Sequence, residues 1–259
     1  LRAWFKKNYG NVAGNGGRKI FLFIDEFTNF NDVEIGKKAV DLLLKLGYSI
    51  EVPNHADSGR SYLSKGMLDE AKVLADKNVR LLSNLINENM PLLGIEPSAI
   101  LTFRDEYPEL VSTELAEKAL GLSKNVLMLD EFLAKEMDAK RIDSSKFKSE
   151  KRLIKLHGHC QQKAVASMVP TKKILSLPKG YEVQLIPSGC CGMAGSFGYE
   201  KEHYDISMKI GELVLFPTVR QQPEDVLIAA PGTSCRHQIH DGTGKHAKHP
   251  IEILWEALA

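Results

Sequence analysis

The stretch that decides the fold is residues 181–192, YEVQLIPSGCCG, where a strand-like run ends at Pro187 before two adjacent cysteines and a glycine. Residues 48–53, YSIEVP, resemble its first half and lead into a Gly-containing turn at residues 57–59. Short apolar runs bounded by proline and glycine are typical of strands. The likeness indicates that the chain contains one structural unit twice.

The likeness extends over residues 19–110 and 151–239. In each stretch a first strand and a helical pattern, clearest at residues 34–46, precede the second strand, and a polar helix leads to a third strand. The paired segments are 20–24 and 153–156, 48–53 and 181–187, 66–87 and 201–215, and 91–95 and 226–230. Strands that alternate with helices predict βαβ crossovers and a parallel sheet. We therefore expect an α/β fold with two pseudo-symmetric repeats, each a small parallel-sheet βαβ unit with flanking helices.

We expect three segments along the chain: an N-terminal linker over 1–18, a first repeat without cysteines over 19–140, and a second repeat over 141–259. The Gly-rich segment 14–17 precedes a strand, whereas a dinucleotide-binding loop follows one, so we interpret it as part of the linker. The chain starts without methionine, and we expect it to be the C-terminal piece of a longer protein.

The composition argues against several functional classes. With 34 basic and 33 acidic residues, the net charge is +1, which favours neither nucleic acid nor an anionic membrane as a partner. We find no apolar run near the roughly 18–20 residues that span a bilayer, and no secretory signal. We expect a cytoplasmic protein without a transmembrane segment.

All four cysteines lie in the last 100 residues, at Cys160, Cys190, Cys191 and Cys235, which is too few for a disulfide scaffold. Each lies just past a predicted strand, and ligands of parallel sheets bind beyond the carboxyl ends of the strands. Gly192 allows a tight turn that could aim both adjacent sulfurs at one ion. Four thiolates suit a [4Fe–4S] cluster or a tetrahedral zinc ion. We therefore predict one metal or iron–sulfur site.

Other interpretations remain open at this point. The cysteines could be inert buried thiols, or Cys190 and Cys191 could form a strained disulfide. A thiol enzyme would need a cysteine activated by a neighbouring histidine. The flanking histidines are possible ligands, although each alone is better explained by local hydrogen bonds; they are His157, His159 and His237.

Weaker candidates have structural explanations that we favour. The C-terminal histidines could bind a stray metal, but we expect a polar loop. The paired acids could take part in general acid–base chemistry, but we expect helix capping and solvation. These residues are His240, His246 and His249, and Asp25, Glu26, Asp105 and Glu106.

The cysteine spacing resembles the cysteine-rich "CCG" domain family. The matching motifs are HGHCQQKA at 157–164, GCCGMAGSFGYE at 189–200 and GTSCRHQI at 232–239, while EPSA at 96–99 and RDE at 104–106 match a segment of the first repeat. The family includes the cysteine-rich subunit of heterodisulfide reductase and iron–sulfur subunits of glycolate and glycerol-3-phosphate oxidoreductases. The chain looks most like the C-terminal region of bacterial FAD-linked oxidases of the D-lactate and D-2-hydroxyglutarate dehydrogenase type.

This resemblance implies a [4Fe–4S] electron-transfer module, with zinc as the alternative, held by Cys160, Cys190, Cys191 and Cys235. It implies FAD on an upstream domain absent here, a ferredoxin-like domain or subunit, and a quinone or other electron acceptor, at a place that could be peripheral to the inner face of the membrane. The chain departs from the family pattern in two ways. The terminal Cys-x-x-Cys is reduced to Cys235, and the first repeat has Asp57, Ser58 and Ala99 where the family has cysteines. We therefore expect no cluster in the first repeat.

Overall fold

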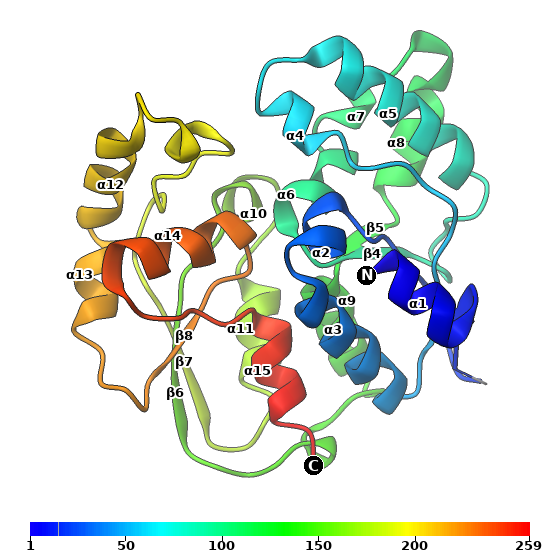
Figure 1. The fold of residues 1–259 in the computed structure, drawn as a ribbon. Coiled ribbons are helices and arrows are strands. Elements are labelled where there is room, and N and C mark those ends of the chain that lie inside the picture. The colour runs from blue at the N-terminus through cyan, green and yellow to red at the C-terminus, as the bar shows by residue number, and fades with distance from the viewer. Residues whose placement is uncertain (15) are drawn as a thin grey trace. The chain divides into compact units, whose positions relative to one another are not determined.

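The computed structural model describes residues 1–14 and 16–259, and Asn15 of the 14–17 segment lies outside them. By its internal contacts the chain divides into two units, Leu1–Phe132 and Leu133–Ala259. Each unit has its own sheet with helices around it (Figure 1). The predicted boundaries at 18/19 and 140/141 stay predictions, since internal contacts alone do not define a repeat.

The first unit is built on a five-stranded sheet of order β1-β3-β2-β4-β5. All of its pairings are parallel except that of β1 with β3. The three residues Ile20, Phe21 and Leu22 of β2 are all buried, as expected for a central strand covered on both faces. The strands are β1 (Val12–Ala13), β2 (Lys19–Leu22), β3 (Ser49–Glu51), β4 (Leu92–Gly94) and β5 (Val126–Met128).

The predicted helix at 34–46 is α3, which buries one apolar face through Ile35, Ala39 and Leu42. Helix α1 lies within the 1–18 segment, and its Phe5 is buried in this unit together with Leu1. The helices of the first unit are α1 (Arg2–Tyr9), α2 (Glu26–Phe30), α3 (Val33–Lys45), α4 (Arg60–Leu63), α5 (Leu68–Leu82), α6 (Pro97–Ile100), α7 (Tyr107–Leu110), α8 (Ala116–Ser123) and α9 (Leu129–Asp138), the last of which runs across the division between the units.

The second unit is built on a three-stranded parallel sheet of order β7-β6-β8. The central strand β6 buries Ile154 and Leu156 completely. The strands are β6 (Arg152–Leu156), β7 (Tyr181–Leu185) and β8 (Leu227–Ala229). Their parallel alignment places the three loops that follow them at one edge of the sheet.

Two groups of helices cover this sheet. Helices α12, α13 and α14 pack against one another, while α11 packs on α15 and β7, and Figure 1 shows the two groups on opposite sides. The helices are α10 (Cys160–Val165), α11 (Val169–Leu175), α12 (Tyr204–Glu212), α13 (Leu215–Arg220), α14 (Thr233–Thr243) and α15 (Pro250–Glu256).

The predicted α/β class is confirmed, and the six predicted strands all form. The polar helix predicted over 201–215 is the shorter α12, Tyr204–Glu212. The backbone of Val214 is not helical, and a separate helix, α13, begins at Leu215. Of the four paired acids, Asp25 caps α2 by accepting hydrogen bonds from the Thr28 N–H and hydroxyl. The Glu26 carboxylate instead accepts from Ser58, and Glu106 pairs with Arg60 without capping α7.

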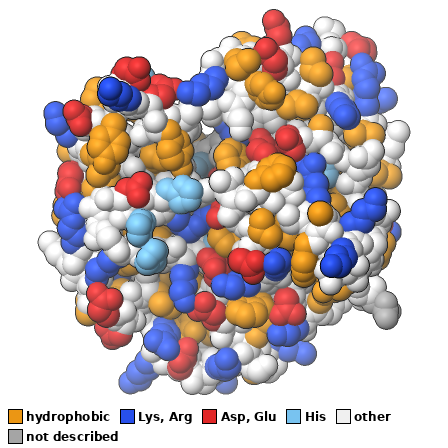
Figure 2. Space-filling model, viewed as in Figure 1, with side chains coloured by type: hydrophobic (Ala, Val, Ile, Leu, Met, Phe, Trp, Pro, Cys, Tyr) orange, Lys and Arg blue, Asp and Glu red, His pale blue; other side chains and the backbone are white. Residues whose placement is uncertain are grey.

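Charged side chains of both signs are interspersed on the face shown in Figure 2. Over the described ranges 1–14 and 16–259, no helix combines the length and the apolar character needed to cross a bilayer.

Candidate metal centre

The three loops that follow β6, β7 and β8 carry all four cysteines. Cys160 begins α10, Cys190 and Cys191 lie in the loop after β7, and Cys235 lies in the first turn of α14. Because the strands are parallel, these loops meet at the carboxyl edge of one sheet. This is the edge at which open α/β sheets bind ligands.

The Cys190–Cys191 turn depends on Gly192. The residue has φ +104°, and a Cβ atom there would lie 2.1 Å from the backbone oxygen of Ser207 in α12. Its N–H points to the Cys190 sulfur at 3.2 Å. Only glycine allows the chain to turn this sharply while α12 stays close, so the residue fixes where both adjacent sulfurs lie.

The first cysteine loop is tied to the second through Lys163 of α10. Its ammonium donates to the backbone oxygen of Ser188 at 2.9 Å and also contacts the oxygen of Gly189. The Cys160 thiol lies 3.9 Å from that Gly189 oxygen. Cys160 and the Cys190–Cys191 loop are therefore held together by contacts that need no metal.

The third loop is shaped by Gly232 and Arg236. A Cβ on Gly232 would lie 2.4 Å from the His159 ring and 3.3 Å from the Cys235 sulfur, so the missing side chain lets the first and third loops approach. The buried Arg236 guanidinium donates to the backbone oxygens of Ala230 at 3.1 Å and Pro231 at 2.7 Å. These bonds fix the start of α14 and hence Cys235.

The four sulfurs form a continuous row: Cys160 contacts Cys190, Cys190 contacts Cys191, and Cys191 contacts Cys235. All four are free thiols, so the disulfide considered for Cys190 and Cys191 is not formed. The row ends at His157, which lies with Cys191 and Cys235 in a buried group whose ligand atoms are all within 4.8 Å of one another. One ion or cluster can therefore contact side chains from all three loops.

The pKa values of the thiols alternate along this row. Hydrogen bonding from Cys160 lowers the pKa of Cys190, and hydrogen bonding from Cys191 lowers the pKa of Cys235 well below its usual range. The contact with Cys190 raises the pKa of Cys160, and contacts with Cys190 and Cys235 raise that of Cys191, with burial adding to both. Neighbouring thiolates repel one another, so a bound cation is what would let all four ionise.

The row has a buried and a partly exposed end. Cys191 and Cys235 belong to an apolar cluster with Met193, Phe216 and Ile239, whereas Cys160 and Cys190 are only partly buried. A group bound here would be shielded from water on one side and accessible on the other.

The three flanking histidines differ in position. His157 is fully buried and lies in the group with Cys191 and Cys235. His159 packs on Gly232 beside Cys235, and its buried Nδ1 has no hydrogen-bond partner within residues 1–14 and 16–259. His237 is exposed and is 2.9 Å from the Tyr199 hydroxyl.

The polar loop predicted for the C-terminal histidines contains His246, but His240 lies in α14 and the buried His249 begins α15 as its cap. His240 and His246 stack at the surface with their ring centroids 4.5 Å apart, while His249 caps α15 by accepting from the Ile251 N–H.

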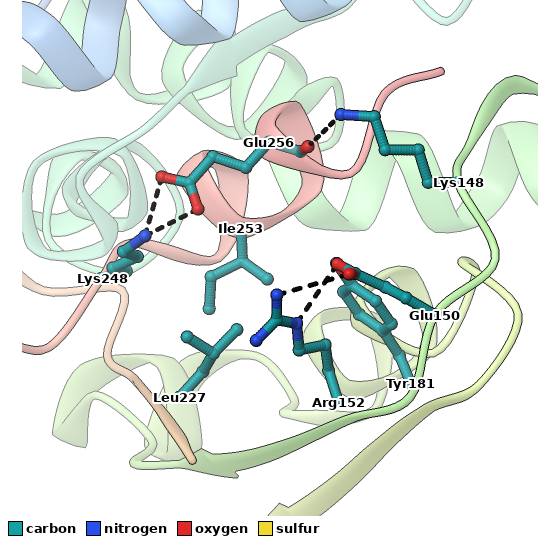
Figure 3. A pocket seen from close by; sticks show the side chains of 8 residues that line it. All are labelled: Lys148, Glu150, Arg152, Tyr181, Leu227, Lys248, Ile253 and Glu256. Atoms are coloured by element: carbon teal, nitrogen blue, oxygen red, sulfur yellow. Dashed lines mark hydrogen bonds and ion pairs between the residues drawn. The ribbon is translucent and has the colours of Figure 1, made fainter. Parts of the chain in front are cut away.

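A second hollow lies at the opposite edge of the same sheet (Figure 3). This pocket of about 370 Å³ is lined by the first residues of the three strands, Arg152, Tyr181 and Leu227. Its charges are paired internally, Arg152 with Glu150 and Lys248 with Glu256. The pocket is thus at the sheet edge away from the thiols, and Lys148, whose ammonium donates to the backbone oxygen of Glu256, leaves it with one positive charge more than its two carboxylates balance.

Sequence reasoning singled out the four cysteines, Gly192 and the three histidines, and which of them bind a ligand stays a prediction. It missed the supporting residues Ser188, Lys163, Arg236 and Ser207. Ser188 is hydrogen-bonded to His157, 31 residues earlier, and Ser207 accepts from Gln238, 31 residues later. Only the folded chain brings the members of each pair together.

Comparison with known proteins relates the chain to oxidoreductases. It is 27% identical over 247 residues to D-2-hydroxyglutarate dehydrogenase of Escherichia coli, 25% over 260 residues to a subunit of the anaerobic glycerol-3-phosphate dehydrogenase of Escherichia coli, and 26% over 242 residues to lactate utilization protein A of Bacillus licheniformis. These matches cover 95%, 98% and 91% of the chain. No protein-family model matches it.

The share of each relative that is matched differs widely. The chain spans 23% of the D-2-hydroxyglutarate dehydrogenase, 64% of the glycerol-3-phosphate dehydrogenase subunit and 96% of the lactate utilization protein. The same sequence region thus occurs within a much larger polypeptide in one relative and makes up nearly the whole of another.

Proposed function

We propose that this chain is the [4Fe–4S] electron-transfer module of an FAD-linked oxidoreductase that oxidises a 2-hydroxy acid. The observation that carries the proposal is the row of four thiols from three loops at the carboxyl edge of one sheet. The similarity to dehydrogenases, in one of which the chain matches only 23% of the length, supports a module within a larger enzyme. The cysteine spacing supports membership of the CCG family.

The donor set fits an iron–sulfur cluster. Thiolates are the usual ligands of such clusters, and Cys160, Cys190, Cys191 and Cys235 supply four of them. When bound, the cluster supplies a one-electron carrier. The apolar residues around Cys191 and Cys235 lower the local dielectric, which affects the potential of any redox group there. The partly exposed Cys160 and Cys190 provide the side from which electrons enter or leave.

The remaining parts of this function lie outside the chain. We propose that FAD is carried by an upstream domain or subunit, with a ferredoxin-like domain, and that electrons pass to a quinone or another acceptor. The enzyme would work in the cytoplasm or at the inner face of the membrane. The three-part division of the chain into 1–18, 19–140 and 141–259 belongs to the same proposal.

A structural or regulatory zinc module is the second candidate. The group formed by His157, Cys191 and Cys235 favours it, because imidazole with thiolates is a common tetrahedral zinc set. In that case the chain would carry no electrons.

Metal and sulfide analysis separates the two functions. The chain is purified without oxygen and reconstituted with iron and sulfide in one sample and left untreated in another. In the reconstituted sample we expect iron and acid-labile sulfide in equal amounts, and an EPR signal from the cluster after reduction. Zinc at one ion per chain with no sulfide in either sample would overturn the electron-transfer function. Rapid alkylation of a single thiol in the metal-loaded protein would instead favour a thiol enzyme.

A further inference from the structure

His157 differs from every other histidine of the described chain in its combination of burial and surroundings. Its side chain is fully buried, directly after β6, and lies with the sulfurs of Cys191 and Cys235 within 4.8 Å. A buried polar ring normally has both nitrogens hydrogen-bonded, because a buried polar group without a partner destabilises the fold. Each of the two ring nitrogens of His157 is therefore expected to have a partner.

One nitrogen is already used. Nδ1 lies 2.7 Å from the Ser188 hydroxyl, and Ser188 is itself buried. The serine belongs to the loop that also carries Cys190 and Cys191. This bond holds the imidazole plane in one orientation and leaves Nε2 as the nitrogen free to bind an ion.

The other nitrogen faces sulfur. Nε2 is buried and makes no hydrogen bond to a nitrogen or oxygen atom of residues 1–14 and 16–259. One ring nitrogen of His157 lies within 4.8 Å of the sulfurs of Cys191 and Cys235, and Nδ1 is the nitrogen that Ser188 holds. Nε2 thus points to the place where a metal bound by Cys191 and Cys235 would lie.

The geometry points to His157 Nε2 as a nitrogen ligand of the metal centre, beside Cys191 and Cys235, with Ser188 as the positioning residue. This inference rests on the proposed function and specifies the ligand set at its buried side. A histidine ligand whose other nitrogen is held by a hydrogen-bonding partner is the common arrangement in metal sites. A [4Fe–4S] cluster or a tetrahedral zinc ion takes four protein ligands, so His157 would replace one of the two partly exposed thiols, Cys160 or Cys190, in the four-thiolate set proposed above.

The alternatives among the histidines fit less well. His237 is exposed and bonded to Tyr199. His159 is near Cys235, but its unsatisfied atom is Nδ1, and no hydrogen bond within the described residues fixes its ring. Neither has the combination of a fixed first nitrogen and a buried second nitrogen beside two thiols.

The test detects the nitrogen directly. Protein with ¹⁵N-labelled histidine is loaded anaerobically and reduced, and pulsed EPR measures the hyperfine coupling between the electron spin and nitrogen. We expect the strong coupling of one coordinated histidine, absent from His157→Cys and retained in the control His237→Ala. If the protein holds zinc, X-ray absorption at the zinc edge is expected to show one nitrogen among sulfurs, and sulfur alone in His157→Cys.

Two further measurements test the histidine ligand if His157→Cys folds poorly. Ser188→Ala should weaken metal affinity by about 10- to 100-fold, as loss of a ligand's hydrogen-bonding partner commonly does. With a cluster bound, His157→Cys should lower the midpoint potential, because imidazole in place of thiolate raises it.

The outcomes distinguish the two claims. A metal-loaded wild type without strong histidine coupling, or with coupling unchanged in His157→Cys, overturns the histidine ligand and leaves the metal centre intact. A wild type that binds no metal under any anaerobic condition overturns the proposed function itself.

Discussion

Gly192 carries the sharpest single-residue constraint at the centre, since its φ is +104° and a Cβ would lie 2.1 Å from the Ser207 oxygen. We predict that Gly192→Ala lowers the free energy of unfolding of the second unit by about 1–3 kcal/mol. It should also weaken metal binding, because the Cys190–Cys191 turn has to move. Urea unfolding followed by Trp255 fluorescence and a metal titration measure both effects.

Gly189 offers a matched control two residues before Cys191. A Cβ there would meet nothing within 4 Å, and its φ is not in the left-handed region. Gly189→Ala should therefore change stability by much less. Equal losses for the two variants would show that the left-handed turn does not constrain the site.

Asp25 in the first unit predicts a pH effect on stability. Burial raises the pKa of this carboxyl from 3.8 to about 7, against the lowering by its bonds to Thr28, and Glu96 and Glu26 add to the rise. Because the folded-state pKa is raised, protonated Asp25 contributes to the free energy of unfolding. That contribution is full below about pH 4 and is lost as pH rises through 7. Asp25→Asn should remove that loss.

The measurement compares the unfolding of wild type and Asp25→Asn from pH 4 to 8, followed by Trp4 fluorescence. His55 acts with the opposite sign, since burial lowers its pKa to about 4, so only the difference between the two proteins is diagnostic. A difference that does not change with pH would contradict the prediction.

At the residue scale, the chemistry of the cysteines made them recognisable from sequence alone. Thiols are rare, soft ligands, and their positions past strand ends are visible in the sequence. Ser188 and Lys163 carry no such signal, because serine and lysine are common and their partners lie 31 and 25 residues away. Which histidine faces the sulfurs likewise depends on how α10 and α14 are placed.

At the element scale, the start of α14 is fixed by the buried Arg236 bonds to Ala230 and Pro231. We predict that Arg236→Leu destabilises the second unit by about 1.5–3 kcal/mol, since these bonds involve a charged donor. Metal retention should fall with it because Cys235 precedes Arg236 directly. Thermal unfolding and metal analysis after gel filtration measure the two effects.

Arg220→Leu is the matched control for that substitution. Its ion pair with Glu212 is exposed by 44% on both sides, and such pairs contribute about 0–1 kcal/mol. A loss for Arg220→Leu as large as for Arg236→Leu would mean that burial of the guanidinium does not set its importance.

Strands and helices could be predicted where the sequence showed one clear pattern of apolar residues. Continuous apolar runs predicted β2, β4 and β8, as buried strands of parallel sheets commonly show. Polar residues interrupt β3, β6 and β7, and these strands were predicted from the likeness between the two halves of the chain. The two-residue strand β1 and the edge strand β5 were not predicted, since their sequences have no pattern beyond a few apolar residues. The break between α12 and α13 depends on the packing of Phe216 against Gly211, which a helical periodicity does not reveal.

At the scale of the whole molecule, the two sheets share one strand order. The second predicted strand pairs with the first, and the first with the third, as β3-β2-β4 and as β7-β6-β8. This agreement supports the interpretation of the chain as a diverged repeat, which rested on sequence offsets alone.

The first unit fills the equivalent position with polar contacts. Ser58 is 133 residues before Cys191, and Glu26 is 133 residues before His159. The Glu26 carboxylate accepts from the Ser58 N–H at 2.8 Å and from its hydroxyl at 2.7 Å. A hydrogen-bonded carboxylate and hydroxyl thus lie in the first unit at the positions that carry an imidazole and a thiol in the second.

The central claim is that the four cysteines form one metal centre, and metal stoichiometry tests it most directly. Iron, zinc and sulfide are measured per chain in anaerobically purified wild type and in Cys191→Ser, Cys235→Ser and the first-unit control Ser58→Ala. We predict one centre per chain in wild type and in Ser58→Ala, and loss of most of the metal in both cysteine variants. Full metal retention in Cys191→Ser and Cys235→Ser would contradict the account.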